Sequence, residues 1–335
     1  MATPVGNSRQ SVQRVALLTA EVDGEVAGVD HVPTASMATR NAAPCPRCRR
    51  CGDTVDVVER SMEQRVGWTA GQLRAFVHRY RFYSYAGFPV GVSHAVPSRH
   101  VTVMLSLGDA ITVEGRSQPE SFRAFAAGLQ TAAAKVTDRG AGCGVGIDLT
   151  PRGARALLGL PASAIAGQVV DLDQIWGPRA SELADRLTSV TGWSARVAVL
   201  DRFLIGVMSE PAGPLGAVAR AWDVLVGTAG TVRVGPLADS VGLSRRHLSG
   251  RFIAEYGLSP KQAARVFRFE RAVNLLDEPG HPSLANTAAV CGFFDQAHLA
   301  RDWQALTGMT PTEWLATESK DPHDDSFRVP ATPIS

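Results

Sequence analysis

The stretch VGLSRRHLSGRFIAEYGLSP, residues 241–260, is followed by a second stretch of the same design, VCGFFDQAHLARDWQALTGMTP, residues 290–311. An offset of 51 residues pairs His247 with His298, and it also pairs the Gly-Leu-Ser-Pro ending of the first stretch with Gly-Met-Thr-Pro in the second. Both endings are typical of a helix that stops at a glycine and is followed by a new helix that begins near a proline. The chain therefore contains a duplicated helical unit.

The two copies differ by one residue in the turn. Upstream of the turn the offset is 50, because Gly242 pairs with Gly292, so the second copy has one extra residue before its second helix. Each copy is predicted to be a short helix, a glycine-containing turn and a second helix.

The second helix of each copy is predicted to bury one apolar stripe. Leu248 and Phe252 in the first copy, and Leu299 and Trp303 in the second, are four residues apart and fall on one helix face. The opposite face then points outward, and it carries Arg245, Arg246, Ser249, Gln296 and Arg301. A helix-turn-helix places such a face in the DNA major groove, with the N-caps, here Ser244 and Asp295, near the phosphate backbone. The alternative is an ordinary helical repeat without a DNA partner.

A long helix is predicted between the two copies. The segment SPKQAARVFRFERAVNLLDE, residues 259–278, gives about 17 helical residues and a length of roughly 25 Å. Such a spacer would hold two recognition helices about one DNA turn, roughly 34 Å, apart. One chain could then read two successive major-groove segments.

Residues 214–316 resemble the AraC/XylS family of bacterial transcription regulators. The resemblance is carried by LADSVGLSRRHLSGRF, RFERAVNLL, AAVCGFF and LTGMTPTEW. It implies that base-reading positions fall on Arg246, Ser249, Gly250, Gln296, Ala297 and Arg301, flanked by Arg245, Arg251 and His298. Gly250 departs from the family pattern, which has a long polar residue at this position, and the neighbouring Arg251 is expected to compensate.

Charge and composition exclude several classes of protein. The net charge is +2, and residues 213–316 carry 10 basic and 9 acidic side chains, so DNA affinity must come from local placement of charge. Lysine occurs only at Lys135, Lys261 and Lys320, and the remaining basic residues are arginines spread along the whole chain. No apolar run is long enough for a membrane span, and VALLTA is too short for a signal peptide, so we expect a cytoplasmic protein without a membrane partner.

The region from 65 to 210 is predicted to be an α+β domain. HVTVMLSL (100–107) and GVGIDLT (144–150) alternate apolar and polar residues, as half-buried strands do, and RFYSYAGF and AITV are further short strand candidates. After Thr150, an expected N-cap followed by Pro151, the pattern becomes helical. The Pro/Gly segment 209–216 is the expected domain boundary.

The two ends of the chain lack sustained periodicity. We expect a disordered or weakly ordered leader over residues 1–60 and a disordered tail over residues 317–335. The translation start stays open among Met1, Met37 and Met62.

Three cysteines in the leader suggest an alternative function. Cys45, Cys48 and Cys51 form two overlapping Cys-x-x-Cys steps, similar to one cysteine pair of the Ada-type DNA methyl-phosphotriester sensors, which also carry AraC-like helices. Zinc requires four ligands and no second pair follows at a suitable spacing, so we expect no metal site here. His94 and His100 flank a short loop before the strongest strand and could line a ligand pocket, but two unclustered histidines do not predict a metal.

The sequence thus predicts a multidomain chain, with an N-terminal α+β sensor-like domain at 65–210 and an all-α domain at 214–316 that has two helix-turn-helix units joined by a long helix. The predicted function is that of a sequence-specific transcriptional regulator, not an enzyme, with no cofactor. Double-stranded DNA and RNA polymerase are the implied partners. A small-molecule effector and a homodimer stay open, as does an N-terminal domain that only dimerises. The alternative is an Ada-like alkylation sensor that uses the cysteine cluster.

Overall fold

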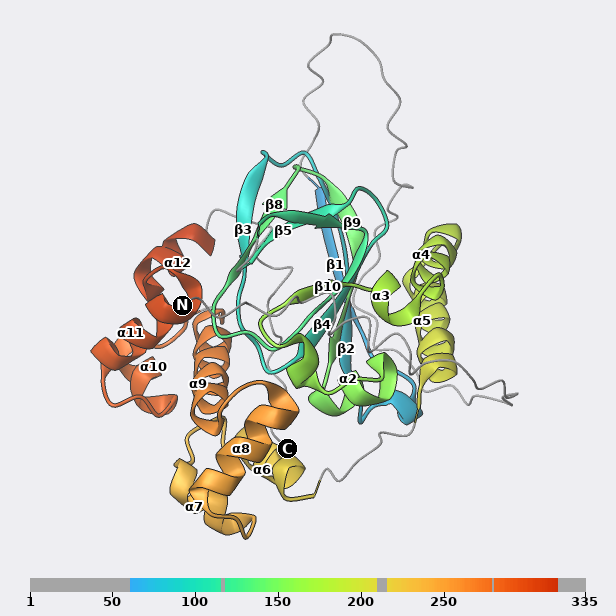
Figure 1. The fold of residues 1–335 in the computed structure, drawn as a ribbon. Coiled ribbons are helices and arrows are strands. Elements are labelled where there is room, and N and C mark those ends of the chain that lie inside the picture. Colours follow the sequence, from blue (N-terminus) through green and yellow to red (C-terminus); the bar gives the residue numbers. More distant parts are fainter. Residues whose placement is uncertain (1–60, 116–117, 210–215, 279, 319–335) are drawn as a thin grey trace, which may run out of the picture.

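The computed structural model describes residues 61–115, 118–209, 216–278 and 280–318, and the chain forms a β-rich N-terminal domain followed by a helical domain (Figure 1). The predicted leader over residues 1–60 lies outside the described residues, as does nearly all of the predicted tail. No helix of the described part of the chain is both long and apolar enough to cross a membrane.

One large antiparallel sheet forms the centre of the N-terminal domain. In the described residues it has six strands, in the spatial order β1 (Ser61–Gly67), β2 (Val77–Ala86), β9 (Gly142–Leu149), β4 (Val101–Ser106), β7 (Ala124–Ala127) and β10 (Val169–Asp171). The strands predicted at 100–107 and 144–150 are confirmed as β4 and β9, which pair with each other in the middle of this sheet.

A second, smaller antiparallel sheet faces the first (Figure 1). Its described strands run in the order β3 (Gly91–Ala95), β8 (Ala134–Asp138), β5 (Ile111–Glu114) and β6 (Glu120–Phe122). A small apolar cluster from both sheets includes Met104 and Phe125 from the large sheet and Val113 and Phe122 from the small one. These side chains hold the two sheets together.

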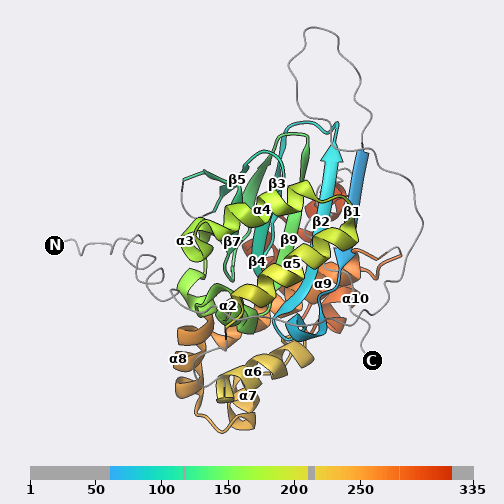
Figure 2. The same ribbon diagram turned by 90° about the vertical axis from the view of Figure 1, so that its right-hand side faces the viewer.

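Helices cover the other face of the large sheet (Figure 2). They are α2 (Pro151–Leu158), α3 (Asp173–Trp176), α4 (Arg179–Ser189) and α5 (Trp193–Val207), with the 3₁₀ helices η1 (Gly71–Leu73) and η2 (Ala162–Ile165). The alternation predicted for β4 and β9 accounts for the packing of the helices on this face. Every second side chain, namely Val101, Val103, Val145 and Ile147, is buried in the same core as the helices. The polar residues between them therefore face the second sheet.

The predicted start of the first helix is confirmed. Thr150 is the N-cap of α2, its side-chain oxygen accepts a hydrogen bond from the Gly153 N–H, and Pro151 opens the helix. The prediction that helices follow all the strands is wrong in one place, because β10 comes after α2 and pairs with β7. β10 has only three residues, which is too short to give a periodic signal.

The second domain consists of helices. They are α6 (Gly216–Gly227), α7 (Val234–Ser240), α8 (Arg245–Tyr256), α9 (Pro260–Leu276), α10 (Leu284–Val290), α11 (Gln296–Thr307) and α12 (Pro311–Glu318). Figure 1 shows α9 between two groups, α6 to α8 on one side and α10 to α12 on the other. The last helix, α12, includes residues 317 and 318, which the sequence analysis placed in the tail. It begins after Thr310, whose hydroxyl accepts a hydrogen bond from the Glu313 N–H.

Candidate nucleic-acid interface

The first unit is α7, a turn and α8, and its second helix starts as predicted. The Ser244 side chain caps α8 by accepting a hydrogen bond from the His247 N–H at 3.3 Å. Leu248 and Phe252 are fully buried, as the predicted stripe requires, and Phe252 packs against Trp222 of α6. The helix is thereby fixed with one face inward.

The opposite face of α8 is open to solvent. Exposed side chains and backbone at this face belong to Ser244, Arg245, Arg246, His247, Gly250 and Arg251, while Ser249 is half-buried. Arg246 and Arg251 make no hydrogen bond or ion pair with any other described residue. A side chain at Gly250 would meet nothing within 4 Å, so this position is an open gap in the face. The guanidinium groups are free to meet a negatively charged partner.

The second unit is α10, a turn and α11, and it repeats the design. Asp295 caps α11 by accepting a hydrogen bond from the His298 N–H at 2.7 Å. Leu299 and Trp303 are buried, and the Trp303 ring packs edge-to-face on Phe269 of α9 with centroids 4.9 Å apart. The predicted stripes and the predicted N-caps of both units are therefore confirmed.

Two of the predicted site residues in α11 are engaged within the protein. The His298 ring is half-buried, its Nδ1 lies 3.2 Å from the Phe294 N–H, and it packs edge-on against Phe293. The Arg301 Nε donates to the Ala297 carbonyl at 3.3 Å, so its guanidinium lies along the helix surface but stays exposed. Asp295, Gln296 and Ala297 are exposed at the start of the helix.

The long helix α9 contacts the aromatic anchors of both units. Phe267 packs against Trp222 of α6 with centroids 5.0 Å apart, and Trp222 in turn packs against Phe252 of the first unit. Phe269 packs against Trp303 of the second unit. At its start, a capping box between Ser259 and Gln262 fixes the first turn. The predicted spacer helix is confirmed, and its buried face positions both recognition helices.

Arginines of α9 also neutralise an acidic residue of α11. Arg265 Nε lies 3.0 Å and Arg268 Nη2 lies 3.6 Å from the Asp302 carboxylate. The negative charge of Asp302 is therefore compensated inside the domain. The pairing with Arg265 and Arg268 reduces the repulsion between the Asp302 carboxylate and any phosphate group that approaches α11.

The N-terminal domain contacts both units. Arg155 of α2 pairs with Glu255 of α8 through two hydrogen bonds of 2.7 and 2.6 Å, and the Ser163 hydroxyl donates to the carbonyl oxygen of Ala254 at 2.6 Å. On the other side, the Ala133 N–H donates to the carbonyl oxygen of Leu306 in α11 at 2.7 Å. Sequence reasoning missed these contacts, because nothing local marks the partner of an ion pair 100 residues away.

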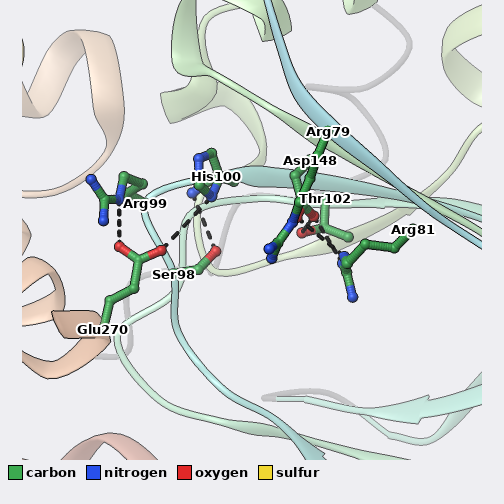
Figure 3. Close-up of polar contacts among 8 residues, drawn as sticks. All are labelled: Arg79, Arg81, Ser98, Arg99, His100, Thr102, Asp148 and Glu270. Carbon is green, nitrogen blue, oxygen red and sulfur yellow. Dashed lines mark hydrogen bonds and ion pairs between the residues drawn. The ribbon is translucent and has the colours of Figure 1, made fainter. Parts of the chain in front are cut away.

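A further contact between the domains involves a buried carboxylate of α9 (Figure 3). Glu270 is 3% exposed and accepts a hydrogen bond from the Arg99 Nε at 2.5 Å, and its other oxygen lies 3.8 Å from the His100 Nδ1. Burial raises the pKa of Glu270, and the Arg99 charge opposes this rise. His100 itself stacks on His78 at 4.5 Å, and burial lowers the pKa of His100 well below its usual value. Arg99 and His100 of the N-terminal domain thus contact the spacer helix α9 at Glu270.

A second buried cluster lies beside this contact, between the two sheets (Figure 3). Asp148 accepts hydrogen bonds from Arg79 Nε at 2.7 Å, from Arg81 Nη2 at 2.8 Å and from the Thr102 hydroxyl at 3.4 Å. Burial alone would raise the pKa of Asp148, but the Arg81 and Arg79 guanidiniums hold it well below its ordinary value. The Arg79 side chain is 2% exposed, and its Nη1 has no hydrogen-bond partner among the described residues.

The other groups singled out in the sequence form no site in the described residues. His94 lies on β3 and His100 follows the next loop, and no set of three or more potential metal ligands comes together in the described part of the chain. The cluster Cys45, Cys48 and Cys51 lies outside the described residues. Of the two remaining cysteines, Cys291 is buried, as expected for an apolar side chain, and Cys143 is half-buried.

Comparison with known proteins gives two family matches. Residues 237–317 match a family described as a helix-turn-helix domain, and residues 69–171 match a family described as a domain of unknown function. No sequence among curated proteins matches the chain.

Several solved structures are similar to the chain. ToxT from Vibrio cholerae is 9% identical, with 78% of this chain and 99% of that chain covered and a TM-score of 0.43. A transcriptional regulator with an AraC-type DNA-binding domain from Chromobacterium violaceum is 24% identical over 32% of this chain and 97% of its own, with a TM-score of 0.30. A DNA-binding transcriptional dual regulator from Escherichia coli K-12 is 22% identical over 34% of this chain and 100% of its own, with a TM-score of 0.29.

The family match covers the duplicated unit from α7 to α12, in which both second helices are N-capped, buried on one side and exposed on the other. Residues 237–317 therefore belong to the helix-turn-helix domain family, and their two capped units have the arrangement that the resemblance to AraC-type regulators predicts for this part of the chain.

Proposed function

We propose that α8 and α11 bind two successive major-groove segments on one face of a DNA duplex. The observation that carries this proposal is the attachment of both units to one helix, α9. Phe269 packs against Trp303 of the second unit, and Phe267 packs against Trp222 of α6, which contacts Phe252 of the first unit. Because both aromatic contacts are made by one continuous helix, that helix sets the spacing and orientation of the two units relative to each other.

The proposed roles follow from exposure and chemistry. Arg246, Ser249 and Gly250 of α8, and Gln296, Ala297 and Arg301 of α11, are proposed to face base edges, where arginine and glutamine side chains have recognised partners. Arg245, Arg251 and the N-terminal ends of both helices, with Ser244, Asp295 and His298, are proposed to lie along the phosphates. In this arrangement His298 acts through its hydrogen bond to the turn and contacts no base.

Selection of bound fragments from random DNA by the full chain tests the proposal. An enriched motif with two parts, one helical turn apart, is expected. Arg246→Ala and Arg301→Ala should each weaken binding to this motif by about 1 to 3 kcal/mol, with less effect on random DNA. Arg202→Ala, which removes an exposed arginine from α5, is the matched control and should leave both affinities unchanged.

A half-site comparison tests whether both units bind. If both do, the full site should bind much more tightly than either half at one fixed salt concentration, since the second contact is intramolecular. A single-part motif, bound equally well without its neighbour, would show that only one unit reads DNA.

The N-terminal domain is proposed to modulate DNA binding through the Glu270 contact. Glu270 belongs to the helix that carries both units, and Arg99 and His100 hold it from the N-terminal domain. A small-molecule effector with a hydrogen-bond acceptor would have an unpartnered donor in the buried Nη1 of Arg79, close to this contact (Figure 3).

A metabolite screen by thermal shift, followed by DNA-binding measurements, tests this modulation. A compound that stabilises the protein and changes DNA affinity should lose its effect on DNA affinity, but not on stability, in Glu270→Gln. If the effect on DNA is unchanged in this variant, Glu270 does not transmit it. A screen without any stabilising compound would favour an N-terminal domain that only dimerises, and sedimentation of the full chain would then decide between one copy and two.

RNA polymerase is proposed as the protein partner on the basis of the regulator class alone. A transcription assay on a promoter that contains the selected motif tests it, because a regulator must change transcript yield there. The Ada-like alternative would require stoichiometric zinc on Cys45, Cys48 and Cys51, which metal analysis of the full chain measures directly.

A further inference from the structure

The inference concerns Phe294, which lies in the turn before α11. Among the described residues it is the most exposed large apolar side chain, with 92% of its surface accessible to solvent. Single apolar residues at a surface are common, so exposure alone indicates nothing. The exposure of Phe294 becomes informative when its position in the duplicated unit is considered.

Comparison of the two copies identifies Phe294 as the extra residue. The Leu243 N–H donates to the Ala238 carbonyl in the first turn, and the Phe293 N–H donates to the Ala288 carbonyl in the second, at 3.0 and 2.9 Å. Leu243 and Phe293 are therefore equivalent, and both pack against the core. The first copy has no residue that corresponds to Phe294.

The usual structural role of an apolar residue at this position does not apply. A residue directly before an N-cap often packs against the fourth helical residue, here Leu299, and fixes the entry of the chain. Phe294 directly precedes the N-cap Asp295, but with 92% of its surface exposed it does not pack onto the helix in this way. The neighbouring Phe293 is buried in its place.

The backbone holds Phe294 at the end of the helix that meets DNA. Its N–H donates to the Nδ1 of His298, one turn along α11, so the residue has a fixed place beside Gln296 and Ala297. Residues at the N-terminal end of a recognition helix are those that reach base edges. A phenyl ring has no donor for a phosphate, whereas apolar contact with the methyl group of thymine is a known mode of base recognition.

We infer that Phe294 contacts the 5-methyl group of a thymine at the edge of the segment bound by α11, and so adds a preference for thymine at that base pair. This inference rests on the proposed function, since it requires α11 to enter the major groove. The first unit lacks an equivalent residue, so the preference should occur in one half of the site only.

Replacement of thymine by deoxyuridine tests the inference, because it removes only the methyl group. Each thymine of the selected site is replaced in turn, and binding is measured for the wild type and for Phe294→Ala. At one thymine in the α11 half, the wild type should lose affinity about fourfold, as expected for one buried methyl group, and Phe294→Ala should lose none. Val92→Ala, which shortens an exposed apolar side chain of β3, should behave as the wild type does.

Three outcomes would overturn the inference. If wild type and Phe294→Ala respond equally to every replacement, no thymine methyl is contacted by this side chain. If Phe294→Ala weakens binding to the selected site and to random DNA by the same factor, the ring contacts the sugar-phosphate backbone. Failure of the chain to enrich any motif would refute the proposed function itself, whereas the other two outcomes leave that function intact.

Discussion

Replacement of Trp303 by alanine should destabilise the second helix-turn-helix unit by about 3 to 5 kcal/mol. The Trp303 side chain is 1% exposed and packs edge-on against Phe269 at 4.9 Å and Trp314 at 6.0 Å. Truncation of a buried tryptophan to alanine leaves a cavity and has an effect of this size. The loss of two aromatic pairs, each worth about 0.5 to 1.5 kcal/mol, places the expected value toward the upper end.

Replacement of the same residue by phenylalanine should have a far smaller effect. The Trp303 Nε1 has no hydrogen-bond partner among the described residues, and an unpaired buried donor is unfavourable by about 1 to 3 kcal/mol. Removal of this donor offsets part of the volume lost. Phe252 already occupies the equivalent position of the first copy and is fully buried there. We expect Trp303→Phe to lie within about 1 kcal/mol of the wild type.

Urea unfolding of the full chain, followed by circular dichroism, measures both effects. The control is Trp68→Ala, because Trp68 is 65% exposed and its removal should change the free energy of unfolding by less than about 0.5 kcal/mol. A small effect of Trp303→Ala would mean that Trp303 is not the anchor of α11. Equal effects of the alanine and phenylalanine variants would mean that the unpaired donor carries no penalty.

Two further variants test the recognition helix and the buried cluster. Gly250→Ala should stabilise the free protein by up to about 1 kcal/mol and raise its melting temperature. Gly250 lies inside α8, and an added methyl group meets nothing within 4 Å. A lower melting temperature would contradict the described packing of α8. Asp148→Asn should destabilise the protein by about 3 to 5 kcal/mol at pH 7, since it leaves the buried Arg79 without its counter-charge. The pKa of Asp148 is held below its ordinary value, so its contribution is present above the unfolded-state pKa of about 3.9 and is lost as the pH falls toward the folded-state pKa. Urea unfolding at pH 7 and pH 3 should therefore show a smaller acid-induced loss in Asp148→Asn than in the wild type, and an equal loss would refute the ion-pair argument.

Local signals explain why the helical domain could be predicted from the sequence. The signals of one helix lie within about a dozen residues of each other. They are an N-cap such as Ser244, a glycine at the helix end such as Gly257, and buried residues spaced four apart. The same signals occur twice, so each copy supports the interpretation of the other. The strands β4 and β9 were predictable for a similar reason, because alternation over six to eight residues is a local pattern.

The contacts between the domains could not be predicted, because they join residues far apart in the chain. Glu270 shares the buried face of α9 with Phe267 and Val273, and nothing near it in the sequence indicates that Arg99 and His100 contact its carboxylate there. His100 attracted notice in the sequence as a pocket or metal candidate. In the structure His100 stacks on His78 and lies beside the Glu270 carboxylate, and neither neighbour is near it in the sequence.

The placement of the interdomain contacts restricts how the N-terminal domain can act on DNA binding. Among the described residues, its hydrogen bonds to the recognition helices reach Ala254 and Glu255 at the end of α8, and Leu306 at the end of α11. The residues proposed to read DNA begin at the opposite, N-terminal ends of these helices, where the N-caps and the exposed side chains lie. These contacts therefore leave the reading ends uncovered, and DNA and the N-terminal domain can hold the same helices at once. If the N-terminal domain regulates DNA binding as proposed above, it can do so by changing the orientation of one recognition helix relative to the other, and the Arg99–Glu270 pair lies on the helix that joins them.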